Sequence, residues 1–406
     1  MKIVFWGDSP TTNTGFGVVA KNLLKRLHSY GHEIIVIGIN NYGPYDHEEY
    51  PYKIYPMHPG SNASIYGLDQ VWPVVKHEQP DLLFMLQDPW FIRDAWENRG
   101  GDFPYLKTLV YYPVDAGPLK PEWLKTLNEM DAQVCYSHYA ERVITDSNKG
   151  VRPDNLHQIY HGVDTKTFRP IHQGQSRQEL GIPTDAFVVG MVARNQPRKR
   201  FDVLLKAFSE FAKDKPNAKL YLHTLMHDFG FDIPDLIRQF DLADRLILTE
   251  GLTPAKGVDD DRLNLIYNTF DVNVLMSLGD GFGLPVAESM ATGCPQLVSG
   301  HSCLEELVDG HGGLTVKTKA WLLNHNDFNT WGGLSDSDDL RDKLELLYNN
   351  APLRIKLAED AYKFIHQDKF NWDVIGIQFQ DIIEQIFRIY RRSNVNQLQL
   401  ANISRS

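Results

Sequence analysis

Residues 278–295 read Leu278-Gly279-Asp280-Gly281-Phe282-Gly283-Leu284-Pro285-Val286-Ala287-Glu288-Ser289-Met290-Ala291-Thr292-Gly293-Cys294-Pro295. The apolar run 270–276 before this segment predicts a buried strand, and Pro285 suits the first turn of a helix. The free N–H groups of a helix start favour an anion, and glycines let the backbone approach a ligand closely. Asp280 lies at the strand end and Glu288 about one turn into the helix, so both could face that ligand. An anion and several hydroxyls in one crevice indicate a sugar nucleotide.

This segment resembles the E-x7-E signature of glycosyltransferase family 4 (group 1), whose members are retaining enzymes of GT-B fold. The family pattern is Glu-Gly-Phe-Gly-Leu-Pro-x-x-Glu. Asp280 replaces the first glutamate and is one methylene shorter, whereas Glu288 matches the second. The resemblance implies that Asp280 contacts the transferred sugar and that Glu288 holds the ribose hydroxyls of the donor. It also implies that the donor lies against the backbone of Gly281, Phe282, Gly283 and Leu284.

Length and composition describe an ordinary globular protein of two domains. The chain has 406 residues, with 42% hydrophobic and 23% charged residues, and is long for a single core. Buried, non-alternating strands alternate with helices in two series, which predicts two Rossmann-like, doubly wound parallel sheets. The strands are expected at 2–6, 33–39, 82–86, 108–112 and 132–136, then at 187–193, 219–223, 246–248, 272–276 and 296–299.

The domain boundary is expected where Gly162, Pro170 and a polar run interrupt this pattern. We assign residues 1–165 to an N-terminal acceptor domain and residues 166–371 to a C-terminal donor domain. Residues 372–406 begin with a long amphipathic helix. GT-B resemblance implies that this helix crosses back to complete the first domain, although spacing alone also allows packing on its own domain. The segment 316–337 looks like an insertion or a long loop.

Two cations follow the strand predicted to open the second domain. Arg194 lies at its carboxyl end and Lys199 follows five residues later. Such a pair can hold a diphosphate, with Arg as a planar fork and Lys as a point charge. The segment is similar to the family element Gly-Arg-x-x-x-x-Lys-Gly, with Ala193 and Arg200 in place of its glycines. A solvated basic turn is the alternative.

A glycine-containing loop follows the first strand, where a dinucleotide site would also lie. It contains Gly15 and Gly17 but lacks the third glycine of G-x-G-x-x-G, and no acidic residue closes the second strand. These departures disfavour an NAD-dependent oxidoreductase. The loop resembles the N-terminal glycine loop of the family, which lies under the donor phosphates. Gly15 and Gly17 are therefore candidate donor-binding residues, the alternative being a tight strand-to-helix connection.

Two further segments contribute candidates. Residues 160–170 resemble the family hinge Asn-Gly-Val-Asp-x-x-x-Phe-x-Pro, which implies that Gly162 and Val163 lie near the donor. Asp115 follows a strand of the first domain where many relatives place a catalytic-cleft histidine. It is a candidate catalytic residue together with Asp280, Glu288, Arg194 and Lys199. A solvated loop carboxylate is the alternative for Asp115.

The resemblance implies metal-independent transfer from a nucleoside diphosphate sugar, of UDP or GDP type, to an acceptor hydroxyl. The cations and helix amides would stabilise the leaving diphosphate, and front-face departure and attack is the scheme the family favours. We expect no metal site and no cofactor other than the sugar donor, because no Asp-x-Asp pair stands at a strand end. The aspartates 259–261 precede a helix, where capping is their expected role. A sugar-nucleotide-binding protein without turnover remains an alternative, which the change at Asp280 keeps open.

The acceptor and the oligomeric state stay open. A glycan, a small molecule, a lipid, a protein side chain or a modified DNA base could accept the sugar, and nucleic acid is expected only in that role because the formal charge is −11. Three cysteines (Cys135, Cys294 and Cys303) cannot all pair with one another, which indicates a reduced, cytoplasmic compartment. No apolar stretch is long enough to span a bilayer. The basic face of Lys21, Lys25 and Arg26 leaves peripheral attachment to a membrane open.

Overall fold

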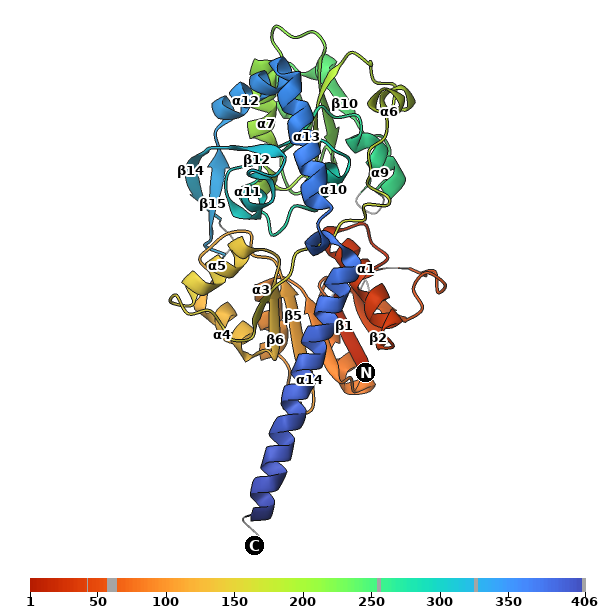
Figure 1. Ribbon diagram of the computed structural model, residues 1–406, viewed down its shortest axis with the longest axis vertical. Helices are drawn as coiled ribbons and strands as arrows, with labels where there is room; N and C mark the ends of the chain where they lie inside the picture. The colour runs from red at the N-terminus through yellow and green to blue at the C-terminus, as the bar shows by residue number, and fades with distance from the viewer. Residues whose placement is uncertain (42, 57–63, 254–256, 325–327, 404–406) are drawn as a thin grey trace.

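The computed structural model describes residues 1–403 except 42, 57–63, 254–256 and 325–327, and gives only the backbone beyond Arg388. Two α/β domains lie one above the other, and helix α14 runs down the first of them (Figure 1). Each domain has one parallel sheet covered by helices. This arrangement confirms the predicted GT-B architecture.

The first domain is built on a seven-stranded parallel sheet of order β3-β2-β1-β4-β5-β6-β7. The central strands are buried along nearly their whole length and are mostly apolar, since helices cover both faces. The strands are β1 (Lys2–Asp8), β2 (Glu33–Ile39), β3 (Lys53–Pro56), β4 (Leu82–Leu86), β5 (Lys107–Tyr112), β6 (Ala132–Cys135) and β7 (Leu156–Gln158). The helices between them are α1 (Gly15–Ser29), α2 (Leu68–Glu78), α3 (Pro89–Glu97), α4 (Pro121–Glu129) and α5 (His138–Ser147).

The second domain repeats the same winding with six parallel strands, in the order β10-β9-β8-β11-β12-β13. These strands are β8 (Phe187–Val192), β9 (Ala218–His223), β10 (Leu246–Leu248), β11 (Val272–Leu275), β12 (Gln296–Ser299) and β13 (Gly313–Val316). The helices are α6 (Gln173–Glu179), α7 (Phe201–Phe211), α8 (Ile233–Gln239), α9 (Asp260–Tyr267), α10 (Leu284–Ala291), α11 (Ser302–Val308), α12 (Ser337–Asn349) and α13 (Ala351–Ile365). Short 3-10 turns are η1 (Pro197–Lys199), η2 (Ala243–Arg245) and η3 (Asp368–Phe370).

Helix α14 (Trp372–Ile403) leaves the second domain and packs on the first, as the resemblance implied. Phe379 on its inner stripe contacts Phe84 of β4 and Tyr111 of β5, with ring centroids 5.6 and 4.9 Å apart. Asp373 pairs with Arg26 of α1 at 2.7 Å. The helix therefore completes the core of a domain that the chain left at the hinge before β8.

The segment 316–337 is not a long loop. Strands β14 (Thr318–Leu323) and β15 (Trp331–Ser335) pair antiparallel into a hairpin. Its end reaches the first domain, where the Trp331 N–H donates to the Gly117 carbonyl at 2.7 Å. A second bridge joins the domains at Glu306 of α11, whose carboxylate accepts from the N–H groups of His138 and Tyr139 at the start of α5.

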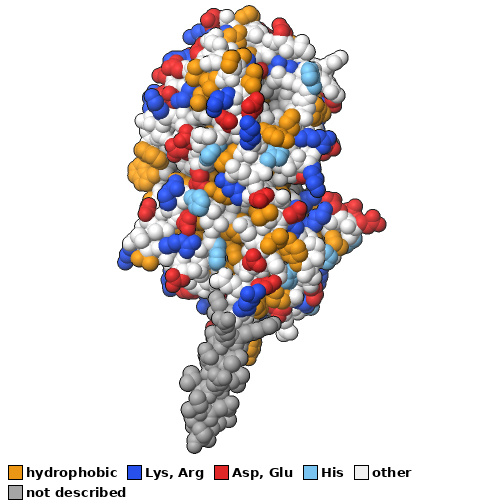
Figure 2. Space-filling model, in the orientation of Figure 1, with side chains coloured by type: hydrophobic (Ala, Val, Ile, Leu, Met, Phe, Trp, Pro, Cys, Tyr) orange, Lys and Arg blue, Asp and Glu red, His pale blue; other side chains and the backbone are white. Residues whose placement is uncertain are grey.

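Charges of both signs are spread over the surface. On the face shown in Figure 2, acidic and basic side chains are interspersed over both domains. Across the described part of the chain, no helix combines the length and the apolar character needed to cross a membrane.

Candidate functional site

The carboxyl ends of β8 and β11 in the second sheet and of β1, β4 and β5 in the first meet at the interface of the two domains. Ligands of doubly wound sheets bind at such strand ends. The loop after β11 contains Asp280, and α10 begins directly behind it. Gly283 caps this helix with φ of 94°, and a Cβ there would lie 2.7 Å from the Leu304 side chain. A glycine is therefore required at this turn. Pro285 has no N–H and the Val286 N–H donates to the Gly283 carbonyl at 2.9 Å, so the N–H groups of Gly283 and Leu284 are the ones that could meet a ligand here.

Asp280 is buried and holds two cations. Lys199 Nζ lies 2.8 and 2.7 Å from the two carboxylate oxygens, and an Arg198 guanidinium nitrogen lies 2.8 Å from Oδ1. Burial opposes ionisation of the Asp280 carboxyl, but the charges of Lys199 and Arg198 outweigh it and hold its pKa well below the usual range. Within the second domain the two cations leave one positive charge beside Asp280, which Asp115 of the first domain offsets in part.

Asp115 of the first domain lies against the same cluster. Its Oδ2 is 3.8 Å from Arg198 Nε, so Arg198 connects a carboxylate of each domain. The backbone packs closely here as well. A Cβ at Gly279 would lie 2.2 Å from the Asp115 carbonyl oxygen, and one at Gly281 would lie 2.7 Å from Pro113 Cβ. The sequence-predicted residues Asp115 and Asp280 are thus brought together.

Two more carboxylates of the first domain, Asp8 and Asp88, have raised pKa values at this interface. Burial and the charges of Asp115 and Asp8 raise the pKa of Asp88 to about 7, although Arg198 opposes the shift. Burial also raises the pKa of Asp8, against the hydrogen bond that it accepts from Thr14. Perturbed carboxyl groups in a cleft are typical of functional sites. The sequence interpretation did not choose Asp8, Asp88 or Arg198 as site residues, although each follows the end of a predicted strand and the strand end 87–90, which contains Asp88, is suggestive in the sequence.

Glu288 lies on the first turns of α10 in an apolar environment. The Tyr267 hydroxyl donates to its Oε2 at 2.9 Å. Burial raises the pKa of Glu288 to about 8, the Tyr267 hydrogen bond opposes the shift, and the Asp260 charge adds to it. The residue is therefore largely protonated at neutral pH and could both donate and accept hydrogen bonds.

Arg194 occupies a different ion-pair cluster from Lys199. Its guanidinium forms a two-point pair with Asp228, at 2.7 and 3.3 Å, and 55% of its side chain is exposed. Its positive charge acts on Asp8 across the interface and partly offsets the burial that raises the pKa of that carboxyl. Arg194 thus faces the first domain, while Lys199 is buried beneath the loop after β11.

The predicted glycine sites divide into two kinds. A Cβ at Gly15 would lie 3.7 Å from Leu284 of the second domain, so this glycine faces α10 across the interface. A Cβ at Gly17 would lie 2.3 Å from Thr12 Oγ1, which gives Gly17 a role in the tight turn before α1. Donor binding at Gly15 and Gly17 stays a prediction.

The hinge residues lie at the crossing of the two domains. A Cβ at Gly162 would lie 2.5 Å from the Trp372 ring, and the Val163 N–H donates to the Phe370 carbonyl at 2.9 Å. Phe282 is buried against His161, with ring centroids 5.0 Å apart. These contacts place the hinge directly behind the loop that contains Asp280.

Within the described residues, no group of three or more histidine, cysteine or carboxylate side chains has the arrangement of a metal site. The aspartates 259–261 begin a helix, as expected, and Asp259 accepts from the Arg262 N–H at 2.7 Å. Asp259 therefore caps α9.

Family models match almost the whole chain. Residues 172–364 match the model described as glycosyl transferases group 1, and residues 13–167 match glycosyltransferase family 4. The two matched ranges correspond to the second and the first domain.

Curated relatives include D-inositol 3-phosphate glycosyltransferases. The protein from Stackebrandtia nassauensis is 29% identical over 65% of this chain and 57% of its own length. A second, from Catenulispora acidiphila, is 32% identical over 41% of this chain and 40% of its own length. The chain spans about half the length of the curated relatives that it matches.

Solved structures share the fold over nearly the full chain. Sucrose-phosphate synthase from Thermosynechococcus elongatus superposes with a TM-score of 0.77 at 17% identity, covering 96% of this chain and 100% of that one. Anabaena Alr3699/HepE in complex with UDP and glucose superposes with a TM-score of 0.69 at 17% identity, covering 95% and 100%. At these identities the likeness shows a common fold.

Proposed function

This chain belongs to the group 1 glycosyltransferases, and from that premise we propose that it moves a sugar from a nucleoside diphosphate donor to an acceptor hydroxyl with retention of configuration. The observation that carries the proposal is the cluster of Lys199, Arg198 and Asp280 beside the N–H groups of Gly283 and Leu284 at the start of α10. Positive charge and oriented N–H groups at one point suit a diphosphate.

The cations would stabilise the leaving diphosphate directly, which supports transfer without a metal ion. Lys199 is already held in position by Asp280, so little reorganisation accompanies the reaction. Arg194 is exposed, and it would exchange its Asp228 partner for a phosphate oxygen. Glu288 would hold the ribose hydroxyls, and its neutral form could both donate to them and accept from them.

The acceptor hydroxyl would approach from the first domain, where Asp115 and Asp88 lie. Front-face attack needs its proton to leave as the glycosidic bond forms, and the departing phosphate oxygen is the base nearest the reaction. Asp115 would then orient the hydroxyl by accepting its hydrogen bond. The proposed localisation is cytoplasmic, where sugar nucleotides are available and thiols such as the buried Cys135, Cys294 and Cys303 stay reduced.

The test is a thermal-shift panel of UDP, GDP, ADP, CMP and NAD, followed by donor-hydrolysis assays with the sugar conjugates of the stabilising nucleotide. UDP is the first candidate, because the Anabaena neighbour was solved with UDP and glucose. We expect one nucleoside diphosphate to raise the melting temperature and Arg194→Ala to remove that rise. Arg238→Ala is the matched control, since the side chain of Arg238 is 71% exposed and pairs with Asp235, three residues earlier on the same helix.

Stabilisation by NAD alone would overturn the proposal and restore a dinucleotide role for the loop at Gly15. Nucleotide binding without hydrolysis or transfer of any conjugate would favour the alternative of a sugar-nucleotide-binding protein. The Asp280 carboxylate, already occupied by two cations, is the feature that favours this second candidate.

A further inference from the structure

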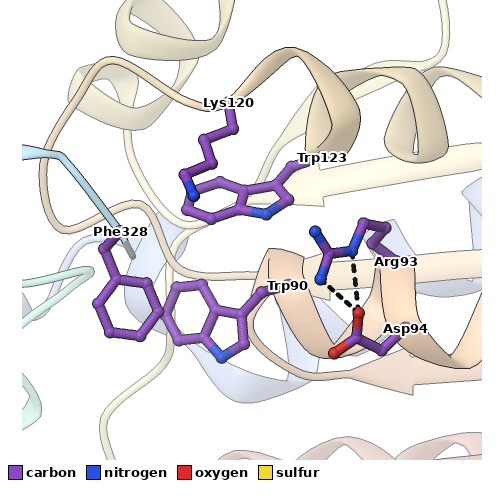
Figure 3. A pocket seen from close by; sticks show the side chains of 6 residues that line it. All are labelled: Trp90, Arg93, Asp94, Lys120, Trp123 and Phe328. Carbon is purple, nitrogen blue, oxygen red and sulfur yellow. Dashed lines mark hydrogen bonds and ion pairs between the residues drawn. The ribbon is translucent and has the colours of Figure 1, made fainter. Parts of the chain in front are cut away.

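A pocket lies beside the interface, between α3, the segment before α4 and the hairpin of the second domain (Figure 3). Its volume is about 320 Å³, near the lower end of the range of about 300–1,000 Å³ typical of small-molecule sites. The lining residues are Trp90, Arg93, Asp94, Lys120, Trp123 and Phe328. We propose that this pocket binds a neutral sugar ring of the acceptor, so that the acceptor is a glycan. This inference rests on the proposed function.

Residues that line the pocket follow the first-domain carboxylates Asp88 and Asp115 closely in the sequence. Trp90 follows Asp88 by two residues at the start of α3, and Lys120 follows Asp115 by five residues before α4. The ends of β4 and β5 therefore place the carboxylates and the pocket walls on neighbouring parts of one surface. An acceptor whose hydroxyl approached Asp115 could continue into this pocket, whereas the donor site belongs to the strand ends of the second sheet.

Three aromatic rings form a corner rather than a slot. The Trp90 ring lies 4.3 Å from Phe328 and 5.6 Å from Trp123 between centroids, with interplanar angles of 44° and 55°. Because these rings are tilted and in mutual contact, they leave no parallel gap into which a planar nucleobase could insert. The electron-rich faces at such a corner suit the C–H groups of a saturated sugar ring.

The polar side chains of the pocket carry both signs of charge. Arg93 Nε donates to Asp94 Oδ1 at 2.9 Å, and the two side chains face each other in Figure 3. The Lys120 ammonium lies 5.5 Å from the centre of the Trp123 ring. Sugar hydroxyls can accept from Lys120 and Arg93 and donate to Asp94. The Arg93–Asp94 ion pair neutralises itself and Lys120 leaves one positive charge, so the tilted aromatic rings, and not the charges, are what favour a sugar ring over a phosphate here.

Both domains are needed to form the pocket. Phe328 comes from the second domain, and the hydrogen bond from Trp331 to Gly117 holds the hairpin against the first. The pocket is therefore complete only when the hairpin is docked on the acceptor domain. Binding of a sugar here would favour the docked arrangement that also brings Asp115 to Arg198.

The experiment is a glycan microarray probed with the full-length, fluorescently labelled protein in saturating UDP. We expect binding to a related group of glycans, reduced about tenfold or more by Trp90→Ala and by Asp94→Ala. Trp321→Ala is the matched control, because Trp321 lies on the same hairpin and is 56% exposed, outside the pocket. The rise in melting temperature caused by UDP should remain in all three variants, which shows that they fold.

Absence of glycan binding by the wild-type protein, or equal binding by both pocket variants, would overturn the pocket assignment. Saturable binding of a single-stranded DNA or of phosphatidylglycerol vesicles that the pocket variants abolish would likewise overturn it in favour of those ligands. UDP stabilisation without glycan binding leaves the proposed donor function standing, whereas a wild-type protein that no nucleoside diphosphate of the panel stabilises removes that function irrespective of the pocket.

Discussion

Asp280 differs from the glutamate of the family pattern by one methylene, and its surroundings account for the shorter side chain. Lys199 contacts both of its oxygens, and Arg198 contacts one oxygen as well as the Gly279 carbonyl. The Asp280 carboxylate thus lies against Lys199 and Arg198 of its own domain. The Arg198 guanidinium, rather than the carboxylate, is the group that reaches toward Asp115 of the other domain.

Replacing Lys199 should therefore cost stability as well as donor binding. Lys199→Met leaves the buried Asp280 charge with Arg198 alone, and we expect the free energy of unfolding to fall by about 3 kcal/mol. Urea-induced unfolding measures this change. Lys317→Met, at a lysine whose side chain is 82% exposed, is the control and should change stability by no more than about 0.5 kcal/mol. Adding Asp280→Asn to Lys199→Met should recover much of the loss, and equal stability of the single variant and the wild type would contradict the account.

Glu288 should give the stability of the protein a defined pH dependence. Burial raises its pKa from 4.5 to about 8, so between these values the folded protein retains a proton that the unfolded chain releases. The resulting stabilisation is fully present below pH 4.5 and is lost as the pH rises through 8. Relative to Glu288→Gln, which cannot titrate, wild-type stability should fall with increasing pH at up to about 1.4 kcal/mol per unit.

Urea unfolding of both proteins across this pH range is the measurement. If the free energy of unfolding changed with pH in the same way for the wild type and for Glu288→Gln, the Glu288 carboxyl would be ionised in the folded protein. Since the variant preserves the size and hydrogen bonding of the side chain, a cavity is not introduced.

At the scale of elements, the hinge and the start of α14 form one packed unit. Gly162 lies flat against the Trp372 ring, and the next residue bonds to the turn before the helix. Gly162→Ala would place a methyl group 2.5 Å from ring carbon, so we expect destabilisation of about 1–3 kcal/mol. Gly101→Ala is the control, because a methyl group added there would have no neighbour within 4 Å and the residue's φ is not positive. Comparison of the two melting temperatures tests the packing, and equal values would refute it.

The sequence predicted the elements that have a continuous apolar run, and it missed those whose formation depends on contacts with distant segments of the chain. Strands β2, β4, β10 and β12 have the predicted bounds, because continuous apolar runs end at glycine, proline or polar residues. The edge strands β3 and β7 are short and only partly apolar, and they were not predicted. Strand β14 alternates half-buried and exposed residues, but its sequence Thr-Lys-Ala-Trp-Leu-Leu does not alternate polar and apolar residues, and the packing partner of the hairpin at Gly117 lies far away in the sequence.

The candidate site was predictable only in part for the same reason. Asp280, Glu288, Arg194 and Lys199 belong to two local motifs, and the structure puts Lys199 and Asp280 in contact. Asp8, Asp88 and Arg198 gain their importance from strands β1 and β4 and from the turn η1, which meet only in the folded molecule. The ion-pair partner of Arg194, Asp228, belongs to no recognisable sequence motif.

At the scale of the molecule, the two domains are in direct backbone contact at Gly279. A side chain at this position would meet the Asp115 carbonyl, 2.2 Å from its Cβ. We expect Gly279→Val to hold the domains apart, to increase the radius of gyration in small-angle scattering and to abolish transfer while leaving each domain folded. The donor-bound wild type should be at least as compact as the free protein. Scattering curves of Gly279→Val and wild type that coincide would contradict this contact.

The hydrogen bond from Val163 to Phe370 has a topological consequence. The chain leaves the first domain and returns to it at one point, so the second domain is inserted into the first as a loop with adjacent ends. Insertions of this kind can be exchanged, since a replacement needs only two neighbouring ends. A chimaera that grafts the inserted domain of a relative between residues 165 and 372 should take its nucleotide preference from the graft. Its acceptor should follow the host when the graft keeps an aromatic residue at the place of Phe328, because that residue completes the acceptor pocket.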